Sequence, residues 1–240
     1  MGKKSVAVGK HNQNAYKGDT YIRGNTYKDR STVIFTPSRG SIPVRVVQAW
    51  NALQKPMNQK TTHIFLVNQE VGKAYEQMVD IIRSNPELKT WRYVVTLEED
   101  NAPPPDGLLK LYEDMDASGF DAIGSLYWTK GEPGTAKPMC YGRPDIMPLN
   151  FVPWLPPANS VAQCNGLGMG FTIFKTKMFL DERFARPIFK TEQSYDPQKG
   201  VRAFTQDLYF AEAAHKLGYR FGCSTRVLTG HYDLTTDTMH

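Results

Sequence analysis

Apolar and polar positions follow two alternating periodicities along the first half of the chain. Runs of β-branched and aromatic residues, typical of buried strands, are each followed by a segment whose apolar residues recur at helical spacing. This pattern predicts strands at residues 31–36, 61–67, 91–97 and 120–127, and helices at residues 41–53, 72–83 and 105–115. Pro37 is expected to stop the first strand, and Ser41 to cap the first helix.

The second half of the chain has a different character. Residues 131–157 contain seven prolines and no clear periodicity, which predicts a long irregular segment of the kind that usually serves function. Regular elements are expected again at residues 170–174, 219–223 and 227–230, as strands, and at residues 205–217, as a helix.

Strands that alternate with helices in this rhythm predict an α/β fold, with a mostly parallel sheet flanked by helices on both faces. We find neither an internal repeat nor a linker, so residues 31–240 are interpreted as a single domain. The chain has no apolar run long enough to span a membrane and no secretory signal. Three scattered cysteines without C-x-x-C spacing indicate reduced thiols, so we expect a cytoplasmic protein without membrane insertion.

The net charge of +5 is concentrated in residues 1–30. This basic N-terminal arm holds seven Lys or Arg residues against two Asp, and it is too poor in aliphatic residues to form a core. Tyrosines interleaved with the cations would allow a grip on a nucleic-acid backbone or stacking on its bases. A solvated tail that contacts no polyanion is the alternative.

The strand predicted at residues 91–97 runs directly into Glu98, Glu99 and Asp100. Adjacent like charges repel each other, and folding alone does not require them there. Carboxylates at the carboxyl end of a buried strand suit a hard divalent cation, and this edge of an open α/β sheet is where ligands bind. The alternative is a solvated acidic loop.

Three further features are expected at the same sheet edge. The turn after the first strand carries Thr36, Pro37, Ser38 and Arg39, which otherwise form an ordinary turn with a helix cap. Asp207 stands near a predicted helix start, where the helix dipole alone would favour it. His231 follows the last strand and is either a third metal ligand or a surface residue.

Together and in this order, these features resemble the GT-A fold glycosyltransferases, in particular the family-2-like enzymes and small phage-encoded relatives, over roughly residues 31–233. Residues 98–100 resemble the DxD motif, Gln206-Asp207 resembles the Glu-Asp motif, and residues 165–170 resemble the glycine-rich acceptor-side segment. Two positions depart from the family pattern, because Glu98 stands at the first acidic position of DxD and Gln206 replaces a glutamate.

The resemblance implies a metal-dependent, inverting transfer of a sugar from a nucleotide-diphosphate sugar, a UDP-sugar being favoured, to an acceptor hydroxyl. Asp207 would be the catalytic base, and Asp100 and His231 would hold Mn²⁺ or Mg²⁺. The implied site residues for the donor are Thr36, Pro37, Ser38, Arg39, Asn68, Glu98 and Glu99, and those for the acceptor or a lid are Trp128, Lys130, Trp154, Gly166, Gly168 and Gly170. Glu99 is expected to contribute least of the three acids, and Tyr127 is expected to be available for stacking on a ligand.

The acceptor stays open at this point. Hydroxymethylated bases in DNA, held by the arm, are one hypothesis, and a small glycan, a lipid-linked sugar or a protein is another. A non-catalytic nucleic-acid or carbohydrate binding protein with a degenerate GT-A fold is the alternative function. A nucleotidyltransferase and a Rossmann oxidoreductase are disfavoured, because the glycine-rich signatures that they need after the first strand are absent.

Overall fold

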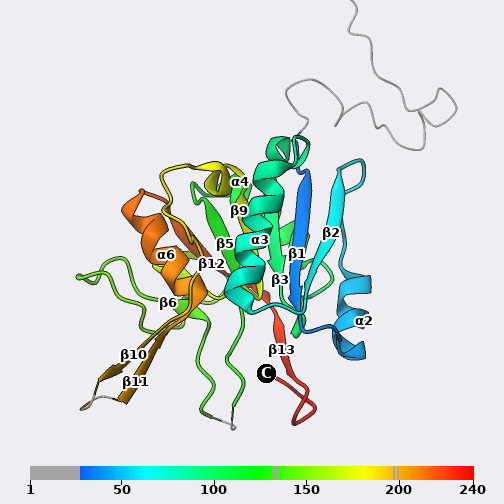
Figure 1. The fold of residues 1–240 in the computed structure, drawn as a ribbon. Helices are drawn as coiled ribbons and strands as arrows, with labels where there is room; N and C mark the ends of the chain where they lie inside the picture. The colour runs from blue at the N-terminus through cyan, green and yellow to red at the C-terminus, as the bar shows by residue number, and fades with distance from the viewer. Residues whose placement is uncertain (1–27, 132–133, 197, 199) are drawn as a thin grey trace, which may run out of the picture.

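A seven-stranded sheet runs through the middle of the computed structural model, which describes residues 28–131, 134–196, 198 and 200–240 (Figure 1). The strands of this sheet, in spatial order, are β2 (Thr61–Val67), β1 (Thr32–Ser38), β3 (Tyr93–Leu97), β9 (Phe171–Lys175), β5 (Ala122–Leu126), β12 (Phe221–Leu228) and β7 (Val161–Cys164). Five of them are mutually parallel, while β9 and β7 run antiparallel to their neighbours. The predicted α/β fold with a mostly parallel sheet is therefore confirmed.

Helices cover both faces of the sheet, because β1 and β3 are buried at every position and therefore on both faces. Val33, Phe35 and Val94 face α3 (Val71–Ser84), α5 (Lys177–Leu180) and α6 (Gln206–Lys216). Ile34 and Val95 face α4 (Gly107–Ala117) on the other side, near α2 (Val44–Ala52).

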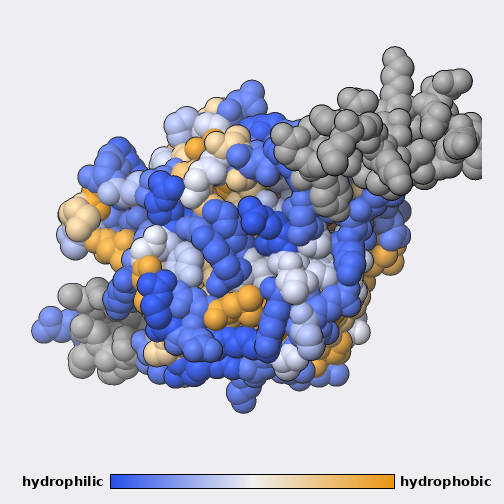
Figure 2. Space-filling model, turned by 90° about the horizontal axis from the view of Figure 1, so that it is seen from above, coloured by the Kyte–Doolittle hydropathy of each residue, from blue (hydrophilic) through white to orange (hydrophobic). Residues whose placement is uncertain are grey.

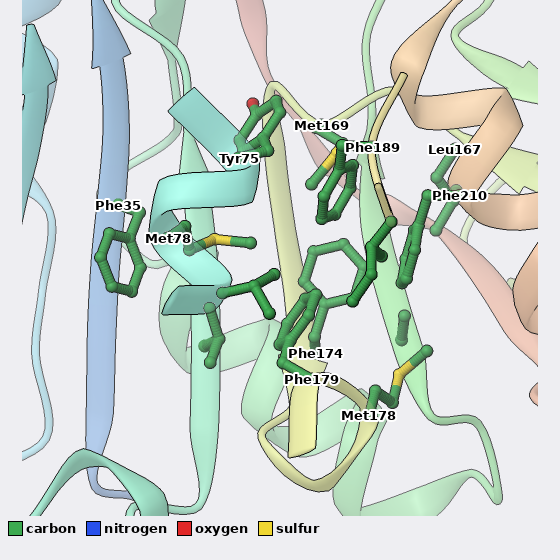
Figure 3. Packing of buried hydrophobic residues seen from close by; sticks show 14 of the residues in the cluster. Phe35, Tyr75, Met78, Leu167, Met169, Phe174, Met178, Phe179, Phe189 and Phe210 are labelled. Atoms are coloured by element: carbon green, nitrogen blue, oxygen red, sulfur yellow. The ribbon is translucent and has the colours of Figure 1, made fainter. Parts of the chain in front are cut away.

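Aromatic rings fill the layer between the sheet and helices α3, α5 and α6. Phe210 of α6 stacks on Phe179, Phe184 and Phe189, with ring centroids 5.8, 5.6 and 4.7 Å apart. Figure 3 shows Phe179, Phe189 and Phe210 in one layer with Met78 of α3 and Phe174 of β9. Burial of this many large side chains fixes α6, and hence its first turn, against the sheet.

Several predicted elements differ from the observed ones in extent. β1 continues through Pro37, because pairing with β3 ends at Phe35 and the last residues of β1 have only β2 as a neighbour. The first helix begins after Pro43, and Ser41 lies before it. The two strands expected at residues 219–223 and 227–230 form one strand, β12, which is interrupted by a register shift between Ser224 and Leu228.

The second half of the chain contains short elements that periodicity did not indicate. In the proline-rich segment, β6 (Cys140–Tyr141) pairs with β8 (Gly166–Leu167), which follows that segment. Further along the chain, β10 (Glu192–Asp196) and β11 (Gly200–Phe204) form a hairpin. The three cysteines are free and buried, Cys140 in β6 and the other two on neighbouring strands of the main sheet. Among the described residues, no helix has both the length and the apolar character needed to cross a bilayer.

The two ends of the sheet differ in what surrounds them. At the end where β1 begins, the surface is mostly hydrophilic, with separate small apolar patches (Figure 2). At the other end, β1 and β3 terminate beside a small three-stranded sheet made of β4 (Asn101–Ala102), β13 (Gly230–Asp233) and β14 (Thr238–Met239). The pairing of His231 with Asn101 brings the last part of the chain to the acidic end of β3.

Candidate functional site

The three acids after β3 point to different partners. The turn that carries them is held by the amide of Glu98, which donates to the Gly170 carbonyl at 2.9 Å, and by the amide of Asn101, which donates to the Glu98 carbonyl at 3.0 Å. A tight turn of this kind separates neighbouring side chains, so each carboxylate has its own environment.

Glu99 links the ends of β1 and β3. Its Oε2 accepts hydrogen bonds from the Ser38 hydroxyl at 2.7 Å and from the Arg39 amide at 2.8 Å, and its Oε1 accepts one from Arg39 Nε at 2.6 Å. The carboxylate is almost fully buried, so these bonds replace the water that it has lost. Glu99 was expected to contribute least, and the structure corrects this: it fixes the turn that holds Ser38 and Arg39.

Asp100 is paired with two basic side chains. Its Oδ2 accepts a bond from Lys130 Nζ at 2.5 Å and lies 3.5 Å from His231 Nε2. The opposite ring nitrogen of His231 lies 2.7 Å from the Trp128 carbonyl oxygen, which orients the imidazole toward Asp100. Burial pushes the pKa of Asp100 upward, but the bonds from His231 and Lys130 outweigh it and hold that pKa well below its usual range.

Glu98 is held by a residue that the sequence did not single out. The Tyr75 hydroxyl, on α3, donates to Glu98 Oε1 at 2.8 Å. Burial, followed by the negative charges of Asp100 and Asp207, outweighs the opposing bond from Tyr75 and raises the pKa of Glu98 to about 7. Tyr75 lies on the buried face of an amphipathic helix, where periodicity alone indicates only core packing.

Asp207 lies in the first turn of α6 and is buried. Its Oδ1 accepts a bond from the Leu208 amide at 3.0 Å. Burial raises the pKa of Asp207, against a hydrogen bond from Thr205. Because the Asp207 charge acts on Glu98, the structure brings together the end of β3 and the start of α6, which are more than 100 residues apart in sequence.

Two cavities lie beside the three acids that follow β3. The first, of about 370 Å³, lies between the ends of β1 and β3 and the starts of α3 and α6; it is lined by Pro37, Ser38, Arg39, Gln69, Val71, Glu98, Glu99, Asp100 and Gln206. The second, of about 440 Å³, lies toward the C-terminal segment; it is lined by Arg39, Ser41, Pro43, Glu99, Asp100, Lys130, Tyr232, Asp233, Leu234 and Thr235. Arg39, Glu99 and Asp100 are common to both cavities.

Other predicted site residues have structural partners. Thr36 is fully buried, its hydroxyl donates to the Leu97 carbonyl at 2.6 Å, and it lies 2.8 Å from His63 Nε2. Asn68 is exposed at a positive φ of 59°, and its amide donates to the Ser38 carbonyl at 2.8 Å. Both residues therefore support the turn after β1.

The glycine-rich segment packs around Tyr127. A Cβ atom at Gly168 would lie 2.1 Å from the Tyr127 hydroxyl, and one at Gly170 would lie 2.4 Å from Asn101 Oδ1. Tyr127 is only 1% exposed and its hydroxyl accepts a bond from the Gly170 amide. The expectation that Tyr127 is available for stacking on a ligand is therefore wrong. Gly166 is similarly crowded, by Leu208 and Phe151.

Trp128 and Trp154 are partly buried and pack against the main core cluster. Neither side chain lines the two cavities described above, whereas Lys130, two residues after Trp128, does. Of the residues predicted for the acceptor or lid, Lys130 is therefore the one that lines a cavity beside the acids.

The donor set around Asp100 fits only part of a metal shell. Among the described residues, no group of three or more His, Cys, Asp or Glu side chains is arranged to hold a metal ion. A carboxylate oxygen and an imidazole nitrogen do converge, and the Lys130 ammonium shows that this carboxylate accepts a cation. These residues suit an ion such as Mn²⁺ or Mg²⁺ that takes its remaining ligands from phosphate and water.

No protein-family model and no curated protein sequence matches the chain. The chain resembles a number of solved structures, of which two are described here. A197 from STIV has a TM-score of 0.57 at 20% sequence identity, over 85% of this chain and 86% of that chain. GalNAc-T7, a GT-A glycosyltransferase solved with UDP, GalNAc and Mn²⁺, has a TM-score of 0.55 at 8% identity; the match covers 96% of this chain and 54% of that one, so this chain spans about half of its length. At these identities the likeness shows the fold, which is of the GT-A type.

Proposed function

We propose that the protein is a glycosyltransferase that transfers a sugar from a nucleotide-diphosphate sugar to an acceptor hydroxyl. The observation that carries this proposal is that Glu98 and Asp100 line one cavity together with Gln206, at the end of a GT-A type sheet where such folds bind ligands. Asp207, the next residue after Gln206, is buried near enough to Glu98 for its charge to act on that carboxyl. The likeness to GalNAc-T7, which was solved with UDP, supports a UDP-sugar as the donor.

The turn after β1 is proposed to bind the donor. Arg39 is 81% exposed in its side chain and borders both cavities, so its guanidinium N–H groups are accessible to phosphate oxygens. Glu99 holds Arg39 and Ser38 in place through its buried carboxylate. A preorganised turn of this kind lowers the entropic cost of binding.

Asp207 is proposed as the general base. Its buried carboxylate has a raised pKa, which makes it a stronger proton acceptor than an exposed aspartate would be. In this role it takes the proton of the acceptor hydroxyl as the oxygen attacks the anomeric carbon, and the nucleoside diphosphate leaves from the opposite face, with inversion.

Asp100 and His231 are the residues proposed to hold a divalent ion. When bound, such an ion neutralises the negative charge that builds up on the leaving diphosphate. Mn²⁺ in the GalNAc-T7 structure supports this assignment. DNA with hydroxymethylated bases remains one proposed acceptor, together with glycan, lipid-linked and protein acceptors; the arm that motivated the DNA hypothesis lies, apart from residues 28–30, outside the described residues.

A non-catalytic binding protein is the alternative, and one experiment separates the two functions. A panel of nucleotide sugars is incubated with Mn²⁺, first alone and then with hydroxymethylated DNA, and nucleotide release is measured. We expect release with at least one donor, and its loss in Asp207→Asn and in excess EDTA. Saturable donor binding without release, with any acceptor, would favour the binding protein. Full activity in EDTA would refute the metal assignment but leave the proposed sugar transfer in place.

A further inference from the structure

Lys130 occupies the Asp100 oxygen that a metal ion would use. Its Nζ lies 2.5 Å from Asp100 Oδ2, the same oxygen that His231 Nε2 approaches at 3.5 Å. The ion pair is largely shielded from solvent, with side-chain exposures of 29% for Lys130 and 18% for Asp100. Partly buried pairs are weakly screened by salt, so this contact is stronger than a surface ion pair.

The backbone that precedes Lys130 is held by the segment that faces it, residues 137–138. The Thr129 amide donates to the Lys137 carbonyl at 2.8 Å, and the Lys137 amide donates to the Thr129 hydroxyl at 2.9 Å. Trp128 pairs with Pro138 in an isolated bridge, and its carbonyl oxygen lies 2.7 Å from His231 Nδ1. The same short segment therefore places both the imidazole and the ammonium at Asp100.

We infer that Lys130 is a built-in competitor of the divalent cation, so that the ammonium and the metal ion occupy Asp100 in turn. A divalent ion and an ammonium at one carboxylate oxygen would be within a few ångströms of each other, and their repulsion excludes joint occupancy. This inference rests on the proposed function, since it concerns the metal role assigned to Asp100 and His231.

The exchange has a direct consequence for donor binding. In the protein without donor, Lys130 neutralises Asp100, so metal affinity is low. A diphosphate entering the cavity beside Asp100 offers Lys130 new anionic partners, because Lys130 and Arg39 both line that cavity. Lys130 then leaves Asp100 and the ion takes its place, which couples metal binding to the presence of donor.

The test measures the binding of Mn²⁺ alone, without donor, from the electron paramagnetic resonance signal of free Mn²⁺. We expect Lys130→Gln to bind Mn²⁺ at least tenfold more tightly than the wild-type protein, because the competing charge is removed. Lys130→Arg keeps the charge and is expected to stay within about threefold of wild type. Binding at other carboxylates is subtracted with the Asp100→Asn, Lys130→Gln double variant.

Lys175→Gln is the matched control. Lys175 pairs with Asp121 at 3.2 Å with similar shielding, 21% and 13% exposed, on strand β9 and away from the acids after β3. The Lys175→Gln substitution should leave the affinity for Mn²⁺ unchanged. Equal Mn²⁺ affinity in Lys130→Gln and wild type, with both folded by circular dichroism, would overturn the inference. If Lys130→Gln does not fold, Lys130→Met provides the same comparison. Because no turnover is measured, this outcome is independent of whether the protein transfers a sugar.

Discussion

The Glu99 carboxylate accepts two hydrogen bonds from Arg39, one from the backbone amide to Oε2 at 2.8 Å and one from Nε to Oε1 at 2.6 Å. Glu99 follows β3 and Arg39 follows β1, so this pair joins the two strand ends that border both cavities. The buried Glu99 carboxylate is therefore satisfied by the turn that it organises.

Glu99→Gln is expected to destabilise the protein. The amide keeps one acceptor oxygen but loses the charge, and its NH₂ group faces donors, so we expect the free energy of unfolding to fall by about 2 kcal/mol. Urea unfolding followed by circular dichroism measures this change. Glu113→Gln is the control: Glu113 pairs with Arg226 at 2.8 Å but is 58% exposed, and its loss should change stability by less than about 0.5 kcal/mol. Equal effects of the two variants would contradict the structural role of Glu99.

Stability is expected to fall with acidification because of His63. Its Nε2 lies 2.8 Å from the Thr36 hydroxyl, whose hydrogen goes to Leu97, so neutral His63 donates to Thr36. Burial, together with the charge of Lys55, lowers the pKa of His63 to about 4. The pKa is depressed on folding, so the stabilisation is present above the unfolded-state pKa of about 6.5 and is lost as pH falls toward 4.

The size of this effect is on the order of 1–3 kcal/mol, after allowance for the partial exposure of the ring. Urea unfolding of wild type and His63→Gln at pH 7 and pH 5 isolates it, since the acidic groups titrate alike in both proteins. Glutamine keeps a donor for Thr36 but does not titrate. We expect a smaller loss of stability at pH 5 in the variant; parallel pH dependences would show that His63 does not contribute.

The sequence was sufficient for the elements that are long and strongly periodic. Helix α3 matches its predicted bounds closely, because a buried face imposes one period over many residues. Strands β2 and β3 also match theirs, as runs of β-branched and aromatic residues. The insertion of β9 between β3 and β5 was not predictable in this way. It depends on pairing between segments about 50 to 80 residues apart, which hydropathy does not encode.

The candidate site shows the same division. A carboxylate cluster after a buried strand is visible in the sequence, and so is the order in which Asp207 and His231 follow it along the chain. Each acid has a different hydrogen-bond partner: Tyr75 for Glu98, Arg39 for Glu99 and Lys130 for Asp100. This choice of partners depends on the side-chain rotamers in a tight turn, which no local sequence pattern specifies. Gly168 illustrates the opposite case: it resembles a ligand-binding glycine, yet the Tyr127 hydroxyl occupies the space of its Cβ.

Asp207→Asn is expected to separate binding from chemistry. The amide is nearly isosteric and can still accept the Leu208 hydrogen bond, but it cannot take a proton, so kcat should fall by about 10²- to 10⁴-fold. The KM for the donor should change only a few-fold. Glu212→Gln, on the exposed face of the same helix and paired with Lys216, should leave both constants unchanged. A variant of Asp207 with wild-type kcat would remove it from the role of base.

Removal of residues 1–27 is expected to weaken binding to DNA. This deletion takes away Lys3, Lys4, Lys10, Lys17 and Arg23 but keeps Lys28 and Arg30, which pair with Asp116 on the body. Each phosphate contact that is lost should make the plot of log K against log salt concentration less steep by about 0.7 to 0.9. Fluorescence anisotropy of labelled DNA at several salt concentrations measures both the affinity and this slope.

Substitution of the five cations by Gln, in the full-length chain, separates their charge from the length of the arm and should reproduce the deletion. An unchanged slope in both proteins would exclude the arm as a nucleic-acid contact and would favour a glycan, lipid-linked or protein acceptor.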